Sequence, residues 1–234
     1  MTAAPARELL AEFLGSALLA ATVIGSGIAA ARLSPADTGL QLLENAFATA
    51  LGLAVLILVF QPVSGAHFNP VVTLADCAQG HRPWRDAARY LPTQIAGCIA
   101  GAVLANLMFD LTAVTWSTTE RITPGTLAAE VVATAGLILV IFALARTGRG
   151  HLAAPAVGAY IGAAYWFTSS TSFANPAITI GRMFSDTFAG ISPASAPWFV
   201  LAQLVGAAIG LAVALALFPR GPAAVPADAV AKAG

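Results

Sequence analysis

Charged residues are scarce in this sequence. Only 9% of its 234 residues are Asp, Glu, Lys or Arg, whereas an average soluble domain carries about 25%. The 11 basic and 11 acidic residues balance, so the chain has no net positive charge for binding nucleic acid. Because 58% of the residues are apolar, most of the chain must face lipid or other membrane helices. The composition excludes an ordinary soluble domain and predicts a membrane protein.

Cysteines and catalytic motifs are also few. Cys77 and Cys98 are the only cysteines, and their spacing is not typical of metal ligands. We expect both to be small core residues rather than disulfide partners. The sequence has no Ser/His/Asp set, metal-ligand cluster or phosphate-binding loop. We therefore expect no enzyme activity, no cofactor and no bound metal.

Long apolar runs are abundant. A spanning helix needs roughly 20 apolar residues, and six runs approach or reach this length: 9–29, 40–60, 90–109, 127–144, 153–169 and 198–218. Two shorter segments, 69–78 and 175–184, are too short to cross a membrane. Such half-spanning helices are tolerated only where their ends are buried or line a water-filled cavity. Arg7 and the first run resemble a signal peptide, but Glu12 interrupts the run, so we expect a spanning helix.

Asn-Pro begins each short segment, in SGAHFNPVVTL (64–74) and SFANPAITIGR (172–182). Asn favours the N-cap of a helix and Pro its first position. The side-chain oxygen of Asn69 or Asn175 can cap its helix, which leaves the NH2 group free as a donor. Two such helices meeting at mid-membrane would direct two dipole ends and two amides at one point. That point would accept a neutral polar solute and repel a cation.

The two halves of the chain repeat each other. An Ala-Glu pair, an Asn-Pro pair and a Gln-x-x-Gly-x-x-x-Gly motif occur in the same order in both. These landmarks begin at Ala11 and Ala129, Asn69 and Asn175, and Gln94 and Gln203, at offsets of 118, 106 and 109. Three spans per half predict two copies of opposite orientation in the membrane. We expect repeats in 1–115 and 116–219, a flexible tail in 220–234, and close Gly-x-x-x-Gly packing across the two halves.

The basic residues predict the orientation. With the N-terminus inside, the inner side holds Arg7, Arg82, Arg85, Arg89, Arg146, Arg149, Arg220 and Lys232, and the outer side holds Arg32, Arg121 and Arg182. Cytoplasmic loops carry the excess of basic residues in membrane proteins. We therefore expect a multi-pass protein of the cell (plasma or inner) membrane with both termini in the cytoplasm.

Together these residues resemble the aquaporin superfamily of water and small-solute channels. The resemblance covers nearly the whole chain and rests on SGAHFNPVVT, the second Asn-Pro-Ala, and the paired Ala-Glu and Gln/Gly patterns. It implies six spanning and two re-entrant helices, and a homotetramer in membrane lipid with one pore per subunit for small neutral solutes. The run NPAITIGRMFSDTFAGI is most similar to a bacterial, arsenic-resistance-associated branch that resembles glycerol channels. That branch implies passage of glycerol-like polyols, arsenite as As(OH)3 and water.

The resemblance assigns roles by position. The central constriction would hold Asn69, Val71, Asn175 and Ala177. The carbonyls lining the pore would be those of Ser64, Gly65, Ala66 and His67 on the inner side, and of Ser170, Thr171 and Ser172 on the outer side. Glu12 and Glu130 would be buried acceptors that hold the two loops. Val71 replaces the usual Ala, which should shift the contact between the half-helices and leave the pore open.

The selectivity filter is the main departure from the family. Ile178 and Thr179 stand where glycerol facilitators have Arg and Asp. In the second span, counting back from Asn69 without a gap gives Thr49 as the filter position, and a two-residue gap gives Leu51. In the fifth span, the count without a gap gives Ala163 and the count with a gap gives Tyr165. The last filter position is Ser172. None of these is the His of a tight water filter. We expect a wide, weakly polar and uncharged filter for neutral solutes larger than water.

Arg182 and His67 each allow two interpretations. Arg182 lies one turn beyond Ile178 on the same helical face. It is either a displaced selectivity arginine or, as we favour, an arginine that snorkels to headgroups or pairs with Asp186. His67 has no second His or Cys beside it in the sequence, so we expect it to pack in its loop rather than bind metal or gate the pore.

Alternative functions stay open. The chain could be mainly a water channel, or a coupled transporter, since transporters share the inverted repeat. A coupled transporter needs a carboxylate that cycles through protonation. The candidates for this role are Glu12 and Glu130, and we expect both to hold loops, which favours a passive channel.

Overall fold

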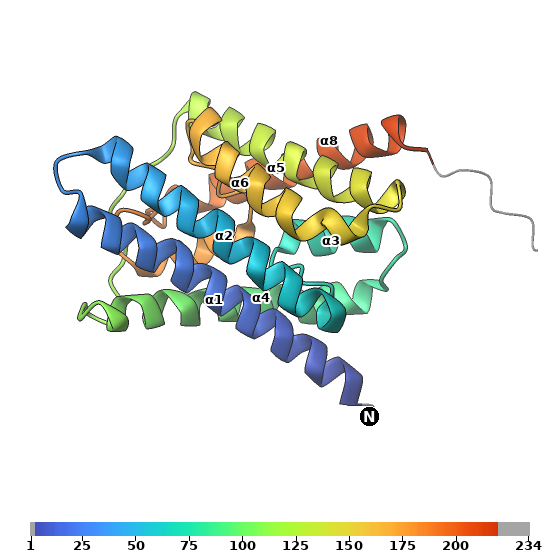
Figure 1. The fold of residues 1–234 in the computed structure, drawn as a ribbon, viewed down its shortest axis with the longest axis horizontal. Coiled ribbons are helices and arrows are strands. Elements are labelled where there is room, and N and C mark those ends of the chain that lie inside the picture. Colours follow the sequence, from blue (N-terminus) through green and yellow to red (C-terminus); the bar gives the residue numbers. More distant parts are fainter. Residues whose placement is uncertain (1–2, 220–234) are drawn as a thin grey trace, which may run out of the picture.

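The structure is a computed structural model that describes residues 3–219. In that range the chain folds into α-helices and two short 3-10 helices (Figure 1). In order these are α1 (Ala3–Leu33), α2 (Thr38–Ser64), α3 (Pro70–Ala78), α4 (Trp84–Met108), α5 (Pro124–Arg146), η1 (Gly150–Leu152), α6 (Ala153–Phe167), α7 (Pro176–Gly181), η2 (Arg182–Phe184) and α8 (Ala196–Leu217). The tail predicted for residues 220–234 lies outside the described residues.

Six long helices run along the molecule, and each coincides with a predicted span (Figure 1). By length and composition, α1, α2, α4, α5 and α8 can cross a membrane. α6 has only 15 residues, and η1 extends it at its N-terminal end. The start of α1 and the end of α8 lie at the same end of the molecule (Figure 1), as an even number of crossings requires.

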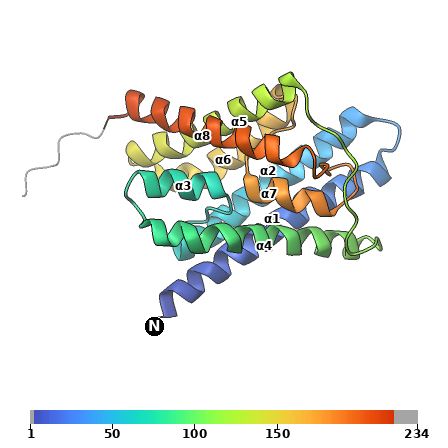
Figure 2. The ribbon, with the colours of Figure 1, turned by 180° about the vertical axis from the view of Figure 1, so that it is seen from behind.

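The two short helices occupy the middle of the bundle. α3 and α7 lie end to end between α4 and α8, and contact each other (Figure 2). Each is therefore covered by one helix of its own half and one of the other half. This arrangement places the starts of both half-helices at mid-depth.

Glycines allow α4 to approach α1 closely. A Cβ added at Gly97 would lie 2.5 Å from the carbonyl oxygen of Phe13, and one added at Gly101 would lie 2.1 Å from that of Ala17. Any larger residue at these positions would displace backbone.

The second half repeats this packing between α8 and α5. A Cβ at Gly206 would lie 2.5 Å from the carbonyl oxygen of Val131, and one at Gly210 would lie 2.2 Å from that of Ala135. The glycine motifs thus join the first and third spans within each half. Our prediction that they pack across the two halves is wrong, because each motif faces the first helix of its own repeat.

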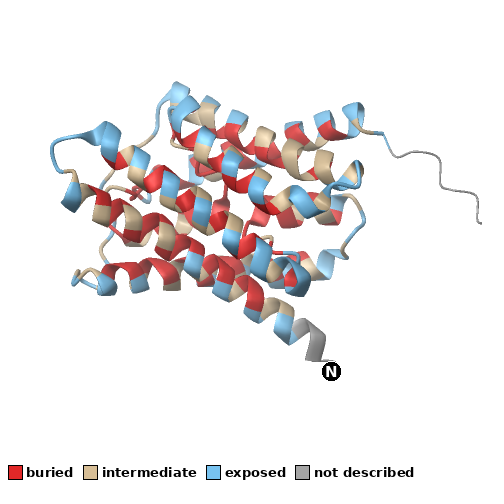
Figure 3. Ribbon diagram, in the orientation of Figure 1, coloured by how far each residue is buried: buried red, intermediate tan, exposed pale blue. Residues whose placement is uncertain are grey.

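Burial follows the expectation for a membrane bundle. Buried residues lie on the helix faces that turn toward the centre, and exposed residues lie on the outer faces (Figure 3). Large apolar side chains stand on the outer faces, among them Phe47 and Leu58 of α2 and Val132 of α5. Extended apolar surfaces of this kind mark contact with lipid or with a partner protein.

Candidate channel between two half-helices

Asn69 and Asn175 are the N-caps of α3 and α7, as predicted. The Asn69 Oδ1 atom accepts a hydrogen bond from the Val71 N–H at 3.1 Å. The Asn175 Oδ1 atom accepts from the N–H groups of Ala177 and Ile178, at 2.9 and 3.3 Å. The side chains thereby satisfy N–H groups that a helix start leaves unpaired.

Each asparagine also reaches across to the other half. Asn69 Nδ2 donates to the carbonyl oxygen of Ala174, and Asn175 Nδ2 donates to that of Phe68, both at 2.8 Å. The two helix starts are therefore joined by a reciprocal pair of bonds. We predicted that the whole NH2 group stays free, which is wrong. One of its two hydrogens bonds to the opposite loop, and only the second is left as a donor.

The loops before the two asparagines share an unusual backbone. Their residues with positive φ are Gly65 (91°), Ala66 (52°) and Phe68 (48°) in the first loop, and Thr171 (62°), Ser172 (51°) and Ala174 (48°) in the second. Each pair is 106 residues apart, the same offset as the asparagines. Non-glycine residues adopt this conformation only where their surroundings enforce it. The repeat therefore extends to the backbone angles of both loops.

Glu12 is fully buried and accepts hydrogen bonds from the first loop. Its carboxylate accepts hydrogen bonds from the backbone N–H groups of His67 and Phe68, at 3.0 and 2.8 Å. The Ser64 hydroxyl and the Gln94 amide also donate to it, at 2.6 and 2.8 Å. Several donors are what a buried carboxylate needs to offset its lost hydration.

Glu130 occupies the matching position in the second half and is also fully buried. It accepts from the backbone N–H groups of Phe173 and Ala174, both at 2.9 Å. The Gln203 amide donates to it at 2.6 Å. In each half, one glutamate ties the re-entrant loop to the first helix of that half.

A cavity of about 170 Å³ lies beside the junction of the half-helices. Both re-entrant loops and helices α1, α2, α5 and α6 contribute to its wall. The predicted site residues that line it are Thr49, Gly65, Ala66, His67, Asn69, Tyr165, Ser172, Asn175, Ile178 and Arg182. The fold thus brings together residues from four separate parts of the sequence.

Two residues predicted at the central constriction lie away from this cavity. Val71 is fully buried in an apolar cluster with Ile138 and Phe142, and Ala177 is buried without lining the cavity. Val72 lines the cavity instead. Successive helical residues point about 100° apart, because a turn holds 3.6 residues. The rotation of α3 therefore turns Val71 into the core, where its larger side chain is accommodated.

Three predicted carbonyl positions are also absent from the wall. The Ser64 carbonyl accepts hydrogen bonds from Arg82 Nη2 at 2.5 Å and from the Tyr90 hydroxyl at 3.1 Å. It is turned toward these side chains and away from the cavity. Ser170 and Thr171 precede the part of the second loop that lines the cavity.

The structure distinguishes the alternative filter positions. Thr49 and Tyr165 both line the cavity, and their hydroxyl oxygens are 3.2 Å apart. Leu51 and Ala163 lie on the exposed faces of their helices. The residue that lines the cavity is therefore the one given by the count without a gap in the second span, and by the count with a gap in the fifth span. The role of these residues as a filter stays a prediction.

Arg182 is buried at the cavity. Its Nε atom donates to the Ala189 carbonyl, and its guanidinium carbon lies 3.4 Å from the ring centroid of Phe173. Asp186 instead accepts from the backbone N–H of Thr118 at 2.9 Å. The favoured interpretation, that Arg182 snorkels or pairs with Asp186, is wrong, because the loop that follows α7 folds back over the arginine.

Acidic residues surround the opposite end of the cavity. Asp76 lies 3.7 Å from His67 Nε2, 2.8 Å from His81 Nδ1 and 3.6 Å from Arg82 Nε. Arg82 also pairs with Glu8 at 3.1 Å. Burial acts to lower the pKa of Arg82, but Tyr90, Glu8 and Asp76 together raise it above its ordinary value, so this guanidinium stays charged.

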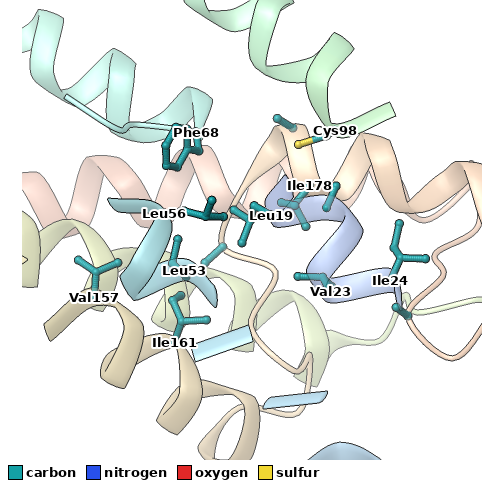
Figure 4. Close-up of a cluster of buried hydrophobic side chains, with 14 of the residues drawn as sticks. Leu19, Val23, Ile24, Leu53, Leu56, Phe68, Cys98, Val157, Ile161 and Ile178 are labelled. Carbon is teal, nitrogen blue, oxygen red and sulfur yellow. The ribbon is translucent and has the colours of Figure 1, made fainter. Parts of the chain in front are cut away.

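The apolar wall of the cavity is a feature that our reading of the sequence missed. Pairs of apolar residues four apart line it from four helices: Leu19 and Val23, Leu53 and Ile57, Leu137 and Ile141, and Val157 and Ile161. Several of these side chains converge in the buried cluster of Figure 4. The signal was the recurrence of the α1 pair 118 residues later in α5, but it is hidden because all faces of these helices are apolar.

Known proteins are similar to this chain in sequence and in fold. The chain matches the major intrinsic protein family over residues 1–174. It is 49% identical over 208 residues to aquaglyceroporin AqpS of Rhizobium meliloti (strain 1021), with 88% of each chain covered. It is 29% identical over 232 residues to the glycerol uptake facilitator protein of Streptococcus pneumoniae (strain ATCC BAA-255 / R6), with 90% of this chain and 97% of the relative covered.

A solved structure has the same fold. The X-ray structure of the aquaglyceroporin from Plasmodium falciparum superposes with a TM-score of 0.69 at 22% identity, over 92% of this chain and 95% of that chain. The predicted all-α, aquaporin-like membrane fold is confirmed. The chain therefore belongs to the major intrinsic protein family, and it is a multi-pass membrane channel of the aquaporin and aquaglyceroporin type, not an enzyme.

Proposed function

We propose that the chain conducts small uncharged solutes passively: glycerol-like polyols, arsenite as neutral As(OH)3, and water. One observation carries this proposal. The cavity is lined both by Asn69 and Asn175, whose amides are donors, and by alkyl side chains such as those of Leu53 and Val157. A polyol also has a hydroxyl edge and a C–H face, so it can match both kinds of lining group.

The proposed filter is formed by Thr49, Tyr165, Ser172, Ile178 and Arg182, which line one cavity. Ile178 replaces the fixed arginine of water channels and glycerol facilitators with an apolar wall. This apolar wall leaves room for triols beside the guanidinium that Arg182 contributes to the filter. The similarity to an aquaglyceroporin and to a glycerol uptake facilitator supports this substrate class.

Passive flow is favoured over coupled transport. A coupled transporter needs a carboxylate that binds and releases its driving ion. Both oxygens of Glu12 and both of Glu130 already accept hydrogen bonds from the re-entrant loops. A carboxylate that loses these bonds would release the loop that it holds.

We further propose a homotetramer with both termini in the cytoplasm. The exposed apolar faces of the outer helices provide surface for lipid and for neighbouring subunits. The acidic cavity end and the start of α1 would then face the cytoplasm, in agreement with the distribution of basic residues. Crosslinking in native membranes tests the tetramer, and labelling of single engineered cysteines from outside cells tests the orientation.

The function is tested by stopped-flow light scattering of proteoliposomes. We expect faster glycerol and water equilibration than in empty liposomes, and faster arsenite uptake measured as arsenic retained after washing. None of these rates should change when ionophores collapse proton and sodium gradients. Water flux without glycerol or arsenite flux would indicate a water channel, and flux abolished by ionophores would indicate a coupled transporter.

A further inference from the structure

Arg182, which lines the cavity, and Arg121 donate their hydrogen bonds to main-chain carbonyls, and both guanidinium groups lie over the Phe173 ring. Arg182 is 3% exposed, and its Nε atom donates to Ala189. Arg121 donates through Nε to the Gly190 carbonyl at 2.7 Å and through Nη2 to that of Phe188 at 3.1 Å. Three consecutive carbonyls thus fix both guanidinium groups, and none of them carries a full negative charge.

The carboxylates of this region have other partners. Asp186 accepts from the Thr118 N–H at 2.9 Å, and Glu120 accepts from the Ser195 hydroxyl at 2.9 Å. Neither arginine forms an ion pair with any residue that the structure describes. Both guanidinium groups therefore lack a directly paired carboxylate among the described residues.

Two residues of this region have side-chain donors without a hydrogen-bond partner among the described residues. No described residue accepts a hydrogen bond from the two Nη atoms of Arg182, whose guanidinium stacks on the Phe173 ring. The Ser172 hydroxyl is buried without a hydrogen-bond partner. Both residues and Tyr165 line the same cavity. A buried donor without a partner is costly, so these groups define a place for an acceptor.

We propose that this outer vestibule binds a small monovalent oxyanion of the carboxylate type. The Nη edge of Arg182 donates to the two carboxylate oxygens in the bidentate geometry that guanidinium favours, and the Ser172 and Tyr165 hydroxyls supply further donors. The guanidinium of Arg182, which has no ion-pair partner among the described residues, matches a monoanion. This ligand differs from the conducted solutes, because it is charged and does not pass.

The anion stops at the vestibule for an electrostatic reason. Deeper in the cavity the wall carries alkyl side chains such as Leu53 and Ile161, and burying an unpaired charge against them is strongly unfavourable. A bound carboxylate therefore occupies the path of neutral solutes and blocks it from outside. The carboxylate is thus proposed to be a reversible blocker of the channel, distinct from the solute that the channel conducts.

Binding is measured on the purified full chain in detergent micelles by ¹⁹F NMR. The probe is trifluoroacetate, and its neutral counterpart trifluoroethanol is the control ligand. We expect saturable line broadening for trifluoroacetate and none for trifluoroethanol. Arg182→Gln should raise the apparent Kd at least about tenfold, because it removes a charge-assisted pair. Arg85→Gln, at an exposed site on another surface, should leave Kd unchanged.

A second variant, Ser172→Ala, tests the proposal if Arg182→Gln does not fold. Ser172→Ala removes only a hydroxyl that has no partner, so it should fold normally and raise Kd about threefold to tenfold. Equal affinity in Ser172→Ala and the parent, or equal broadening of both probes, would overturn the proposal. The assay needs no solute flux, so failure of anion binding is distinguishable from failure of the channel function.

Discussion

The two re-entrant loops have the same backbone and opposite surroundings. His67 and Phe173 are 106 residues apart and occupy equivalent positions. Each donates its backbone N–H to the glutamate of its own half, at 3.0 and 2.9 Å. The side chains then diverge. His67 faces Asp76 at 3.7 Å, whereas Phe173 carries the guanidinium of Arg182 on its ring.

This difference gives the two ends of the cavity opposite charge. At the inner end, two carboxylates, those of Glu8 and Asp76, pair with one arginine, Arg82. At the outer end, Arg121 and Arg182 donate to main-chain carbonyls and form no ion pair with any described residue. The repeated backbone fixes where the loops lie, and the side chains that differ between the repeats decide which ion each end attracts.

The largest loss of stability should come from replacing the buried glutamate that holds the re-entrant loop in each half. Glu12→Gln and Glu130→Gln each replace a charged acceptor with an amide whose NH2 faces backbone N–H donors. We expect each to lower the free energy of unfolding by about 2–4 kcal/mol, measured by thermal unfolding in micelles. Asp110→Asn, at an exposed outer loop, is the matched control. If one glutamate variant is as stable as the control, the two loops are not held alike.

Ile178→Arg should change selectivity strongly at the outer end. A guanidinium at this position narrows the mouth, so glycerol flux should fall on the order of tenfold while water flux persists. Ile178→Leu keeps an apolar wall and is the matched control. Stopped-flow measurements on both variants check this. Equal glycerol flux in Ile178→Arg and the parent would remove Ile178 from the filter.

Asn69→Asp and Asn175→Asp should differ in how strongly they leak cations, and this difference distinguishes the inner end of the cavity from the outer end. Each replaces a donor at the junction with an anion, so transport of neutral solute falls and cations are admitted. The leak should be larger in Asn69→Asp, because acidic residues surround the cavity end nearer to it. The measurement is cation conductance in planar bilayers. Complete exclusion of cations by both variants would contradict the electropositive field that we assign to the junction of the two helix starts.

Exchange of the two divergent side chains should have the smallest effect. His67→Phe removes a contact of 3.0 Å with the Thr73 hydroxyl and should cost about 1 kcal/mol of stability. Phe173→His weakens the stacking of Arg182 and should cost about 0.5–2 kcal/mol. Unfolding midpoints in micelles test both. A loss as large as that of the glutamate variants would show that these side chains, and not the glutamates, hold the loops.

Local signals made much of the fold predictable. Asn-Pro sets a helix cap through contacts within three residues, so the starts of α3 and α7 follow from Asn69 and Asn175 alone. The length of each apolar run likewise gives the spans. Boundaries differ by a few residues because polar ends such as Arg146 still continue a helix.

Side-chain direction was harder to predict. Every face of α3 is apolar near its start, so nothing local shows that Val72, not Val71, faces the cavity. The choice between Ala163 and Tyr165 depends on where the following loop turns, which is a tertiary property. Arg182 binds a carbonyl seven residues later, in a loop whose path depends on contacts with distant segments.

The central claim is that the two helix starts meet at Asn69 and Asn175 and present their remaining amide hydrogens to one solute path. The most direct measurement is an experimental structure of the protein in lipid with glycerol bound. We expect reciprocal Nδ2–carbonyl bonds at the junction and glycerol density in the cavity within hydrogen-bonding distance of an asparagine amide. Asparagines far apart, or glycerol occupying a path that avoids both amides, would contradict the account.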